Sequence, residues 1–98
     1  MVTPAAFEAS LRNPAPPAGL AMPLQALWWA GRNEWDTAHA LVMNDESEDA
    51  AWVHAYLHRV EGDLSNAGYW YRRAGRTPQS APLEREWLEI VTTLLART

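Results

Sequence analysis

The chain contains no cysteine and no lysine, and only one of its 98 residues is phenylalanine. The missing cysteine excludes a disulfide framework, a thiolate nucleophile and a thiolate metal site. A chain without disulfides fits the cytoplasm, where thiols stay reduced, and we expect that location. Because arginine supplies all eight basic residues, we attribute the missing lysine to genomic composition bias rather than to function.

Positive charge and long apolar runs are also scarce. The formal net charge is −4, which argues against a nucleic-acid binder, because such proteins present a basic surface. The longest apolar stretch, residues 19–31, is interrupted by Pro23 and Gln25 and is shorter than the roughly 20 residues of a membrane span. The N-terminal residues lack the basic and apolar segments of a secretory signal. We therefore expect neither a nucleic acid nor a membrane as a partner.

Two common catalytic patterns are absent as well. The serines lie at polar or cap-like positions, and no Gly-x-Ser-x-Gly elbow surrounds any of them. The five glycines are dispersed at turns and helix ends, so no glycine-rich loop can hold a phosphate. Nothing in the sequence supports nucleophilic catalysis, and we expect a protein that is not an enzyme.

What the chain has in excess is tryptophan. Six tryptophans and a hydrophobic fraction of 48% provide apolar surface for one packed core, and 98 residues suit one small domain. Helical periodicity occurs along the chain and no strand pattern does, so the predicted fold class is all-α. We divide the domain, residues 1–98, into an N-terminal helix with a proline-rich arm (1–21), two helical hairpins (22–78) and a capping helix (79–98).

Capping residues and helix breakers mark the ends of six predicted helices. They are predicted to begin near residues 4, 23, 35, 48, 64 and 82. Side chains that can accept the first backbone N–H bonds precede four of these helices, and they are Thr3, Asn33, Ser47 and Asp63. The clearest apolar stripe belongs to the last helix and consists of Leu83, Trp87, Ile90, Val91, Leu94 and Leu95.

An internal repeat relates the two central hairpins. Residues 31–42 and 60–71 align without gaps at an offset of 29 residues, within the range of helical-hairpin arrays. The second unit combines a turn, small residues that allow close packing, an aromatic residue and a terminal proline. These residues are Gly62, Asp63, Ala67, Tyr71, Ala74 and Pro78. With this pattern, the chain resembles the tetratricopeptide-repeat family.

The resemblance implies two tetratricopeptide-like hairpins that present a groove, followed by a capping helix. The chain departs from the family at His54 and His58, where such hairpins use leucine or an aromatic residue in the core. Residues 52–75 are also similar to a segment of small uncharacterised bacterial and fungal proteins, and that resemblance implies no particular activity.

The leading functional hypothesis is a non-catalytic binding or scaffold module. Trp52, Tyr56 and Arg59 follow one another at spacings of four and three residues, so they share one face of a helix. The resemblance implies that this face lines the groove. Aromatic rings and a guanidinium there suit a peptide, a protein partner or a small anionic ligand. His54 and His58 are additional ligand-binding candidates.

This hypothesis requires no cofactor. It predicts that Arg59→Ala abolishes ligand binding and leaves the melting temperature within a few degrees of the wild type. A homodimer that covers exposed aromatic rings is the other kind of partner we consider.

The alternative hypothesis is a small metal-binding protein or a metal-dependent hydrolase. His54 and His58 lie four residues apart on one predicted helix and Glu61 follows three residues later, so the three side chains share a face. Two histidines at this spacing can chelate an ion, and His39 of the neighbouring hairpin can supply another ligand. Glu61 can serve as a ligand or a general base. The competing interpretation is that buried imidazoles bond to backbone carbonyls or nearby acids.

Overall fold

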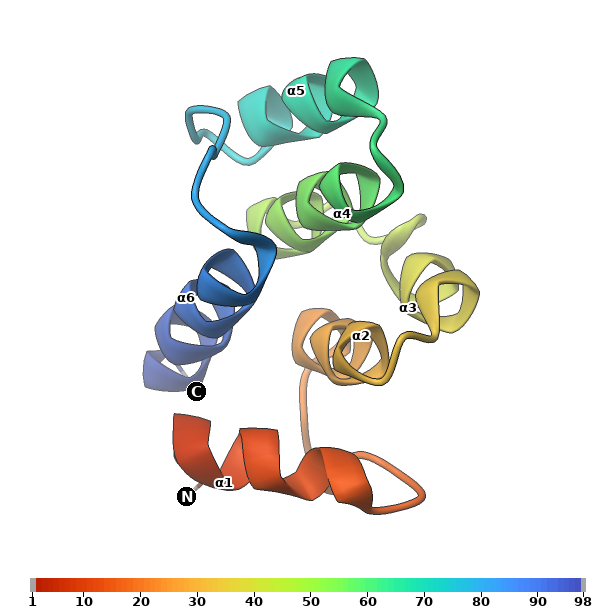
Figure 1. Ribbon diagram of the computed structural model, residues 1–98, viewed down its shortest axis with the longest axis vertical. Coiled ribbons are helices and arrows are strands. Elements are labelled where there is room, and N and C mark those ends of the chain that lie inside the picture. Colours follow the sequence, from red (N-terminus) through yellow and green to blue (C-terminus); the bar gives the residue numbers. More distant parts are fainter. Residues whose placement is uncertain (1, 98) are drawn as a thin grey trace.

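The computed structural model describes residues 2–97, and its regular elements are helices (Figure 1). In chain order they are α1 (Pro4–Ala9), the 3₁₀ helix η1 (Ser10–Arg12), α2 (Met22–Gly31), α3 (Trp35–Val42), α4 (Glu48–Glu61), α5 (Leu64–Arg73) and α6 (Leu83–Ala96). No strand occurs among the described residues, so the predicted all-α fold class is confirmed. Each α-helix begins within one residue of its predicted start.

Hydrogen bonds from side chains explain where three of the helices begin. Thr3, Ser47 and Asp63 each accept a bond of 3.1 Å from the backbone N–H three residues further on. The expected cap at Asn33 is wrong. Its backbone adopts a left-handed conformation, with φ of 63°, and Glu34 takes the N-cap position without a side-chain bond. Asparagine tolerates this conformation better than most residues, so Asn33 forms the turn between α2 and α3 instead.

Two helical hairpins form the centre of the fold. Helix α2 packs on α3, and α4 packs on α5. Helix α4 occupies the middle and also contacts α2, α3 and α6 (Figure 1). The turn of the second hairpin contains Gly62 with φ of 85°, a conformation that favours glycine. Helix α6 returns against α4 and α2, and α1 packs against α6.

Apolar side chains from α1 to α6 meet in one core. The predicted stripe of α6 is buried from Trp87 to Leu95, while Leu83 is half-buried. Gly31 permits a close approach, because a Cβ atom there would lie 3.0 Å from both Leu11 and Trp87. The largest completely buried side chains are Trp28, Tyr71, Phe7, Leu24, Leu27, Leu57, Ile90 and Glu86. The last of these is a carboxylate, and its partners are described below.

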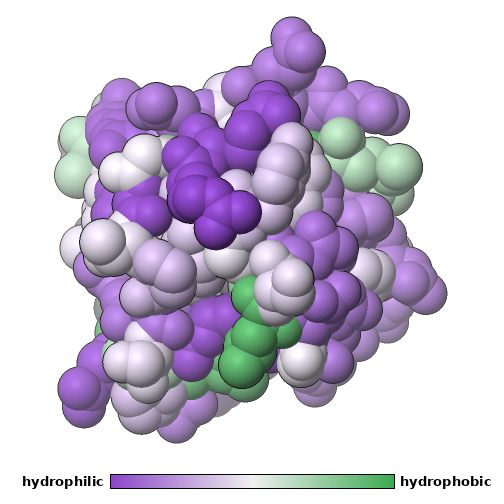
Figure 2. Space-filling model, turned by 90° about the horizontal axis from the view of Figure 1, so that it is seen from above, coloured by the Kyte–Doolittle hydropathy of each residue, from purple (hydrophilic) through white to green (hydrophobic). Residues whose placement is uncertain are grey.

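The outer surface is largely polar. The face seen from above in Figure 2 is mostly hydrophilic, with a compact hydrophobic patch below its centre and smaller hydrophobic areas towards its left and right edges. Within residues 2–97, the exposed large apolar side chains are spread over several elements, and they are Met22, Met43, Val60, Leu64, Tyr69 and Leu88. None of the helices described is long and apolar enough to cross a membrane.

Candidate metal centre between two hairpins

The helix face that carries Trp52, Tyr56 and Arg59 is covered by α6. Trp52 and Tyr56 keep only 3% and 7% of their exposure, and Arg59 reaches across to Glu86 of α6. The structure therefore places the ligand-binding face expected from the sequence inside the fold. A peptide could meet these three side chains together only if α6 moved away from α4.

Glu86 is completely buried, and polar groups of that helix face form hydrogen bonds to its side chain. Its carboxylate accepts bonds from Arg59 Nη1 at 2.6 Å, from the Tyr71 hydroxyl at 2.5 Å and from Trp52 Nε1 at 3.3 Å. Arg59 Nη2 also donates to the carbonyl oxygen of Ala81 at 2.7 Å. Burial acts to lower the pKa of Arg59, but the hydrogen bond and charge of Glu86 outweigh it and raise that pKa. This network fixes α6 on α4 and α5.

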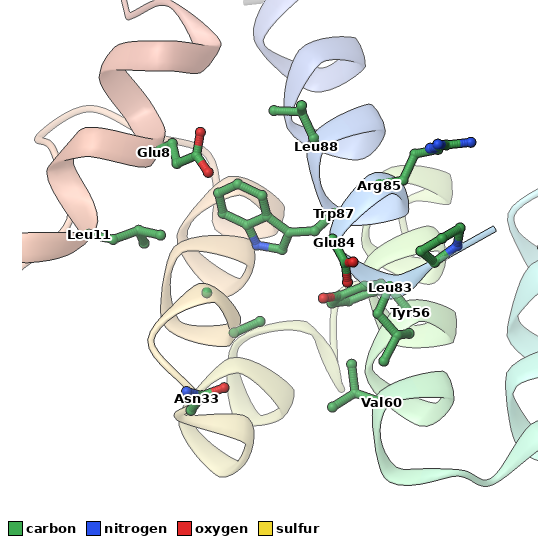
Figure 3. A pocket seen from close by; sticks show the side chains of 13 residues that line it. Glu8, Leu11, Asn33, Tyr56, Val60, Leu83, Glu84, Arg85, Trp87 and Leu88 are labelled. Carbon is green, nitrogen blue, oxygen red and sulfur yellow. The ribbon is translucent and has the colours of Figure 1, made fainter.

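A pocket of about 660 Å³ opens where α1, η1, α2, α4 and α6 meet (Figure 3). Tyr56 contributes to its wall, so one residue of the expected binding face lines a cavity. The remaining wall is mainly apolar and includes Leu11, Val60, Leu83, Trp87 and Leu88. Glu8 and Glu84 add two carboxylates, while Arg85 extends away from the cavity (Figure 3).

The three histidines of the chain meet between α3 and α4. His54 and His58 are four residues apart on α4, so the helix stacks their rings with centroids 4.9 Å apart. His39 enters from α3 in the other hairpin, and its Nε2 lies 3.0 Å from Nε2 of His54. One nitrogen of each ring lies within 4.8 Å of the other two. We call these residues the histidine cluster.

Glu61 extends the histidine cluster on its outer side. Its Oε1 lies 2.6 Å from Nδ1 of His58. A carboxylate oxygen accepts a hydrogen bond from Nδ1–H, and in a neutral ring with this proton on Nδ1 the lone pair lies on Nε2. Histidines that bind metals commonly make this second contact. His54 lacks such a partner, because its buried Nδ1 makes no hydrogen bond to the described residues.

Two tryptophans pack directly against the histidine cluster. The indole of Trp70, on α5, stacks on His54 with centroids 3.9 Å apart and planes 13° apart. Trp35 stacks on His39 with centroids 4.7 Å apart and planes 11° apart. Its Nε1 donates to the carbonyl oxygen of Leu57 at 2.7 Å, which ties α3 to α4. Packing therefore restricts the imidazole rings, as a preorganised site requires.

The electrostatic environment keeps two of the imidazoles neutral. Burial lowers the pKa of His54 to about 4, and the rings of His39 and His58 add to that decrease. Burial, and then the proximity of His58, also lower the pKa of His39, against opposing effects of Glu61 and Asp36. At pH 7 both rings have a lone pair, which is the form that binds metal ions.

Sequence reasoning identified neither Glu86 nor the stacking partners Trp35 and Trp70. For Glu86 a signal exists, because it lies three residues after Leu83 and four before Ile90, within the apolar stripe. A carboxylate at a core-facing position predicts a buried partner. For Trp35 a signal exists too, because it lies four residues before His39 on the same face of the predicted helix. Trp70 carries no comparable signal, since an indole packs against almost any apolar or aromatic neighbour.

Comparison of the chain with protein-family models, with curated proteins and with solved structures gives no match. The resemblance to tetratricopeptide repeats therefore stays a prediction from the sequence. We therefore infer the function from the side chains that the fold brings together.

Proposed function

We propose that this protein is a small helical metal-binding module that holds a divalent transition-metal ion such as Zn²⁺ on His39, His54 and His58. The observation that carries the proposal is the convergence of one nitrogen from each ring within 4.8 Å. Imidazole nitrogens bind Zn²⁺ at roughly 2.0–2.1 Å, so a modest adjustment of the rings brings all three onto one ion. A role as a peptide-binding scaffold has less support, because α6 covers the expected groove.

The donor set suits a borderline metal ion. Imidazole is a good ligand for Zn²⁺, Cu²⁺, Ni²⁺ and Co²⁺, whereas Mg²⁺ and Ca²⁺ require oxygen ligands. The contact between Glu61 and His58 orients one ring. His39 belongs to the first hairpin and the other two histidines to the second, so a bound ion would join the hairpins.

A purely structural role explains the histidine cluster less well. Three packed imidazoles leave one buried nitrogen without a hydrogen bond, namely Nδ1 of His54. Burying a polar atom without a hydrogen-bond partner costs free energy. Leucine at the same positions would avoid this cost, because its side chain has no polar atom. Coordination of a metal ion by one nitrogen of each ring would supply interaction energy that offsets this cost, and Nδ1 of His54 would still have no partner.

Binding of Zn²⁺ is the first test, made on protein without a histidine tag. We expect calorimetry to give one ion per chain, and the melting temperature to rise by roughly 10 °C or more when free Zn²⁺ is about 100-fold above the dissociation constant. His39→Asn should abolish binding, because it removes one ligand from the accessible side of the cluster. Glu61→Gln should weaken binding about 10- to 100-fold.

Glu46→Gln is the matched control, because it removes an exposed acidic group that belongs to neither group of candidate ligands. It should bind Zn²⁺ like the wild type. If wild type shows neither a saturable heat nor a higher melting temperature with Zn²⁺, Cu²⁺, Ni²⁺ or Co²⁺, the proposed function is wrong.

The binding module expected from the sequence is a second candidate, and the pocket at Tyr56 favours it. A volume of about 660 Å³ is in the range of small-molecule sites. The carboxylates of Glu8 and Glu84 favour a cation, which differs from the small anion expected from the sequence. The candidate ligand is therefore an organic amine with an apolar body.

Tryptamine, tryptophol and indole-3-acetate test this second candidate, because they share an indole and differ in charge. We expect only tryptamine to shift amide resonances around Trp87 in a saturable way. Glu84→Gln should weaken that binding several-fold, and Glu34→Gln, outside the pocket, should not. Equal shifts from all three compounds, or none, would exclude a site for cations.

A further inference from the structure

The histidine cluster contains three candidate metal ligands, and within residues 2–97 no fourth candidate atom belongs to the same group. Among the described residues, one group of candidate ligand atoms combines His39, His54 and His58, and another combines His58, Glu61 and Asp63. The two groups share only His58. The carboxylate of Glu61 is bonded to Nδ1 of His58, and the side chain of Asp63 caps α5, so both acids already have partners.

The two tryptophans beside the cluster cannot complete the coordination. An indole N–H only donates hydrogen bonds and has no lone pair for a metal. Trp35 in addition directs its N–H to the carbonyl oxygen of Leu57. The indoles instead cover two of the ligand rings. Trp70 stacks on one face of His54, and Trp35 stacks on one face of His39. Each indole therefore occupies the space above one ligand ring.

The cluster has a side that solvent can reach. His39 is only half-buried, whereas His54 and His58 are buried. The side chain of Glu61 keeps 40% of its exposure. A small molecule can thus approach from the side of α3 and the end of α4 without separating the hairpins.

We infer that a metal ion on His39, His54 and His58 keeps one coordination position open, and that this position takes a small monodentate anion. The inference rests on the proposed function. Zn²⁺ with three protein ligands completes its tetrahedron with water or an external ligand, whereas a structural site is closed by four protein ligands. A neutral set of three imidazoles leaves the ion with its full positive charge, which favours an anion at the open position. The flanking indoles restrict that anion to a slender shape.

The experiment uses Co²⁺, whose visible spectrum reports its coordination, and the full chain without a tag. Co²⁺ is added first, and sodium azide is then titrated into the complex, with sodium benzoate as a bulky anion and sodium chloride as an ionic-strength control. We expect azide to change the cobalt bands saturably, and benzoate to do so at least 10-fold more weakly.

Each outcome decides a different point. If Co²⁺ gives no protein-dependent bands, the inference of an open position is wrong, and the proposed function fails as well if Zn²⁺, Cu²⁺ and Ni²⁺ give no saturable heat. If Co²⁺ binds but azide leaves the bands unchanged, the ion is bound in a closed site, so this inference is wrong while the proposed function stands.

Glu61→Gln serves as the second variant, because a side-chain rotation could bring Glu61 to the ion. We expect azide to bind saturably to both the wild type and the variant once each is saturated with Co²⁺. If azide binds only in the variant, Glu61 is the fourth ligand and the inference is overturned.

Discussion

Arg59→Ala is expected to lower the free energy of unfolding by about 3–5 kcal/mol, because it leaves the carboxylate of Glu86 buried without a counter-charge. Tyr71 and Trp52 would still donate to that carboxylate, but neither is charged. The sequence alone predicts the opposite, namely a lost ligand contact and an almost unchanged melting temperature. Urea unfolding followed by tryptophan fluorescence measures the difference.

Arg97→Ala is the matched control for this prediction. Arg97 also forms an ion pair, with Asp49, but both side chains are exposed, so its removal should cost no more than about 1 kcal/mol. A loss of about 3–5 kcal/mol can unfold a small domain, so the double variant Arg59→Ala with Glu86→Leu provides a second measurement. Without the unpaired charge, it should recover much of the lost stability. Equal effects of Arg59→Ala and Arg97→Ala would show that the buried pair is unimportant.

The metal-free protein is expected to lose about 3 kcal/mol of stability as the pH falls from about 6.5 to 4, because His54 must stay neutral in the fold. Burial lowers the pKa of His54 to about 4 in the folded state, whereas an unfolded histidine titrates near 6.5. Between these values the unfolded chain binds more protons, so stability decreases as the pH decreases. His39 contributes in the same direction. Above about pH 6.5 the stability should not depend on these groups.

Urea unfolding at several pH values, in the presence of a chelator, measures this effect. His54→Leu is the comparison, because leucine fits a core position and cannot titrate. Subtracting its pH profile removes the contribution of the carboxylates, which also titrate in the acid range. Identical profiles for the wild type and His54→Leu would contradict the prediction.

The two largest expected effects have one origin. Both concern polar groups that the fold buries close to α4, Glu86 on the side of α6 and the histidines on the side of α3 and α5. Burial makes each group dependent on its partners, and a change of charge at either place is therefore costly. The Glu86 network and the histidine cluster lie next to each other along α4, because Arg59 directly follows His58.

Local sequence is enough to predict the helices. Caps at Thr3, Ser47 and Asp63, the left-handed Gly62 and the stripe of α6 depend on neighbours a few residues away, so they follow without tertiary information. Helical periodicity by itself also places His54, His58 and Glu61 on one face of α4, because their spacings of four and three residues match the helical turn.

What the tertiary structure decided is which face of α4 meets which partner. From the sequence, both the Trp52 face and the His54 face were candidate sites, because periodicity gives a helix its faces but not their neighbours. The return of α6 brought Glu86, 27 residues beyond Arg59, onto the first face and buried it. The packing of α3 on α4 brought His39, which lies 15 residues before His54, onto the second face. This contact completed the cluster of three imidazoles. The residue types and their spacing thus came from the sequence, whereas the long-range contacts that close one site and assemble the other depend on how the hairpins and the last helix pack.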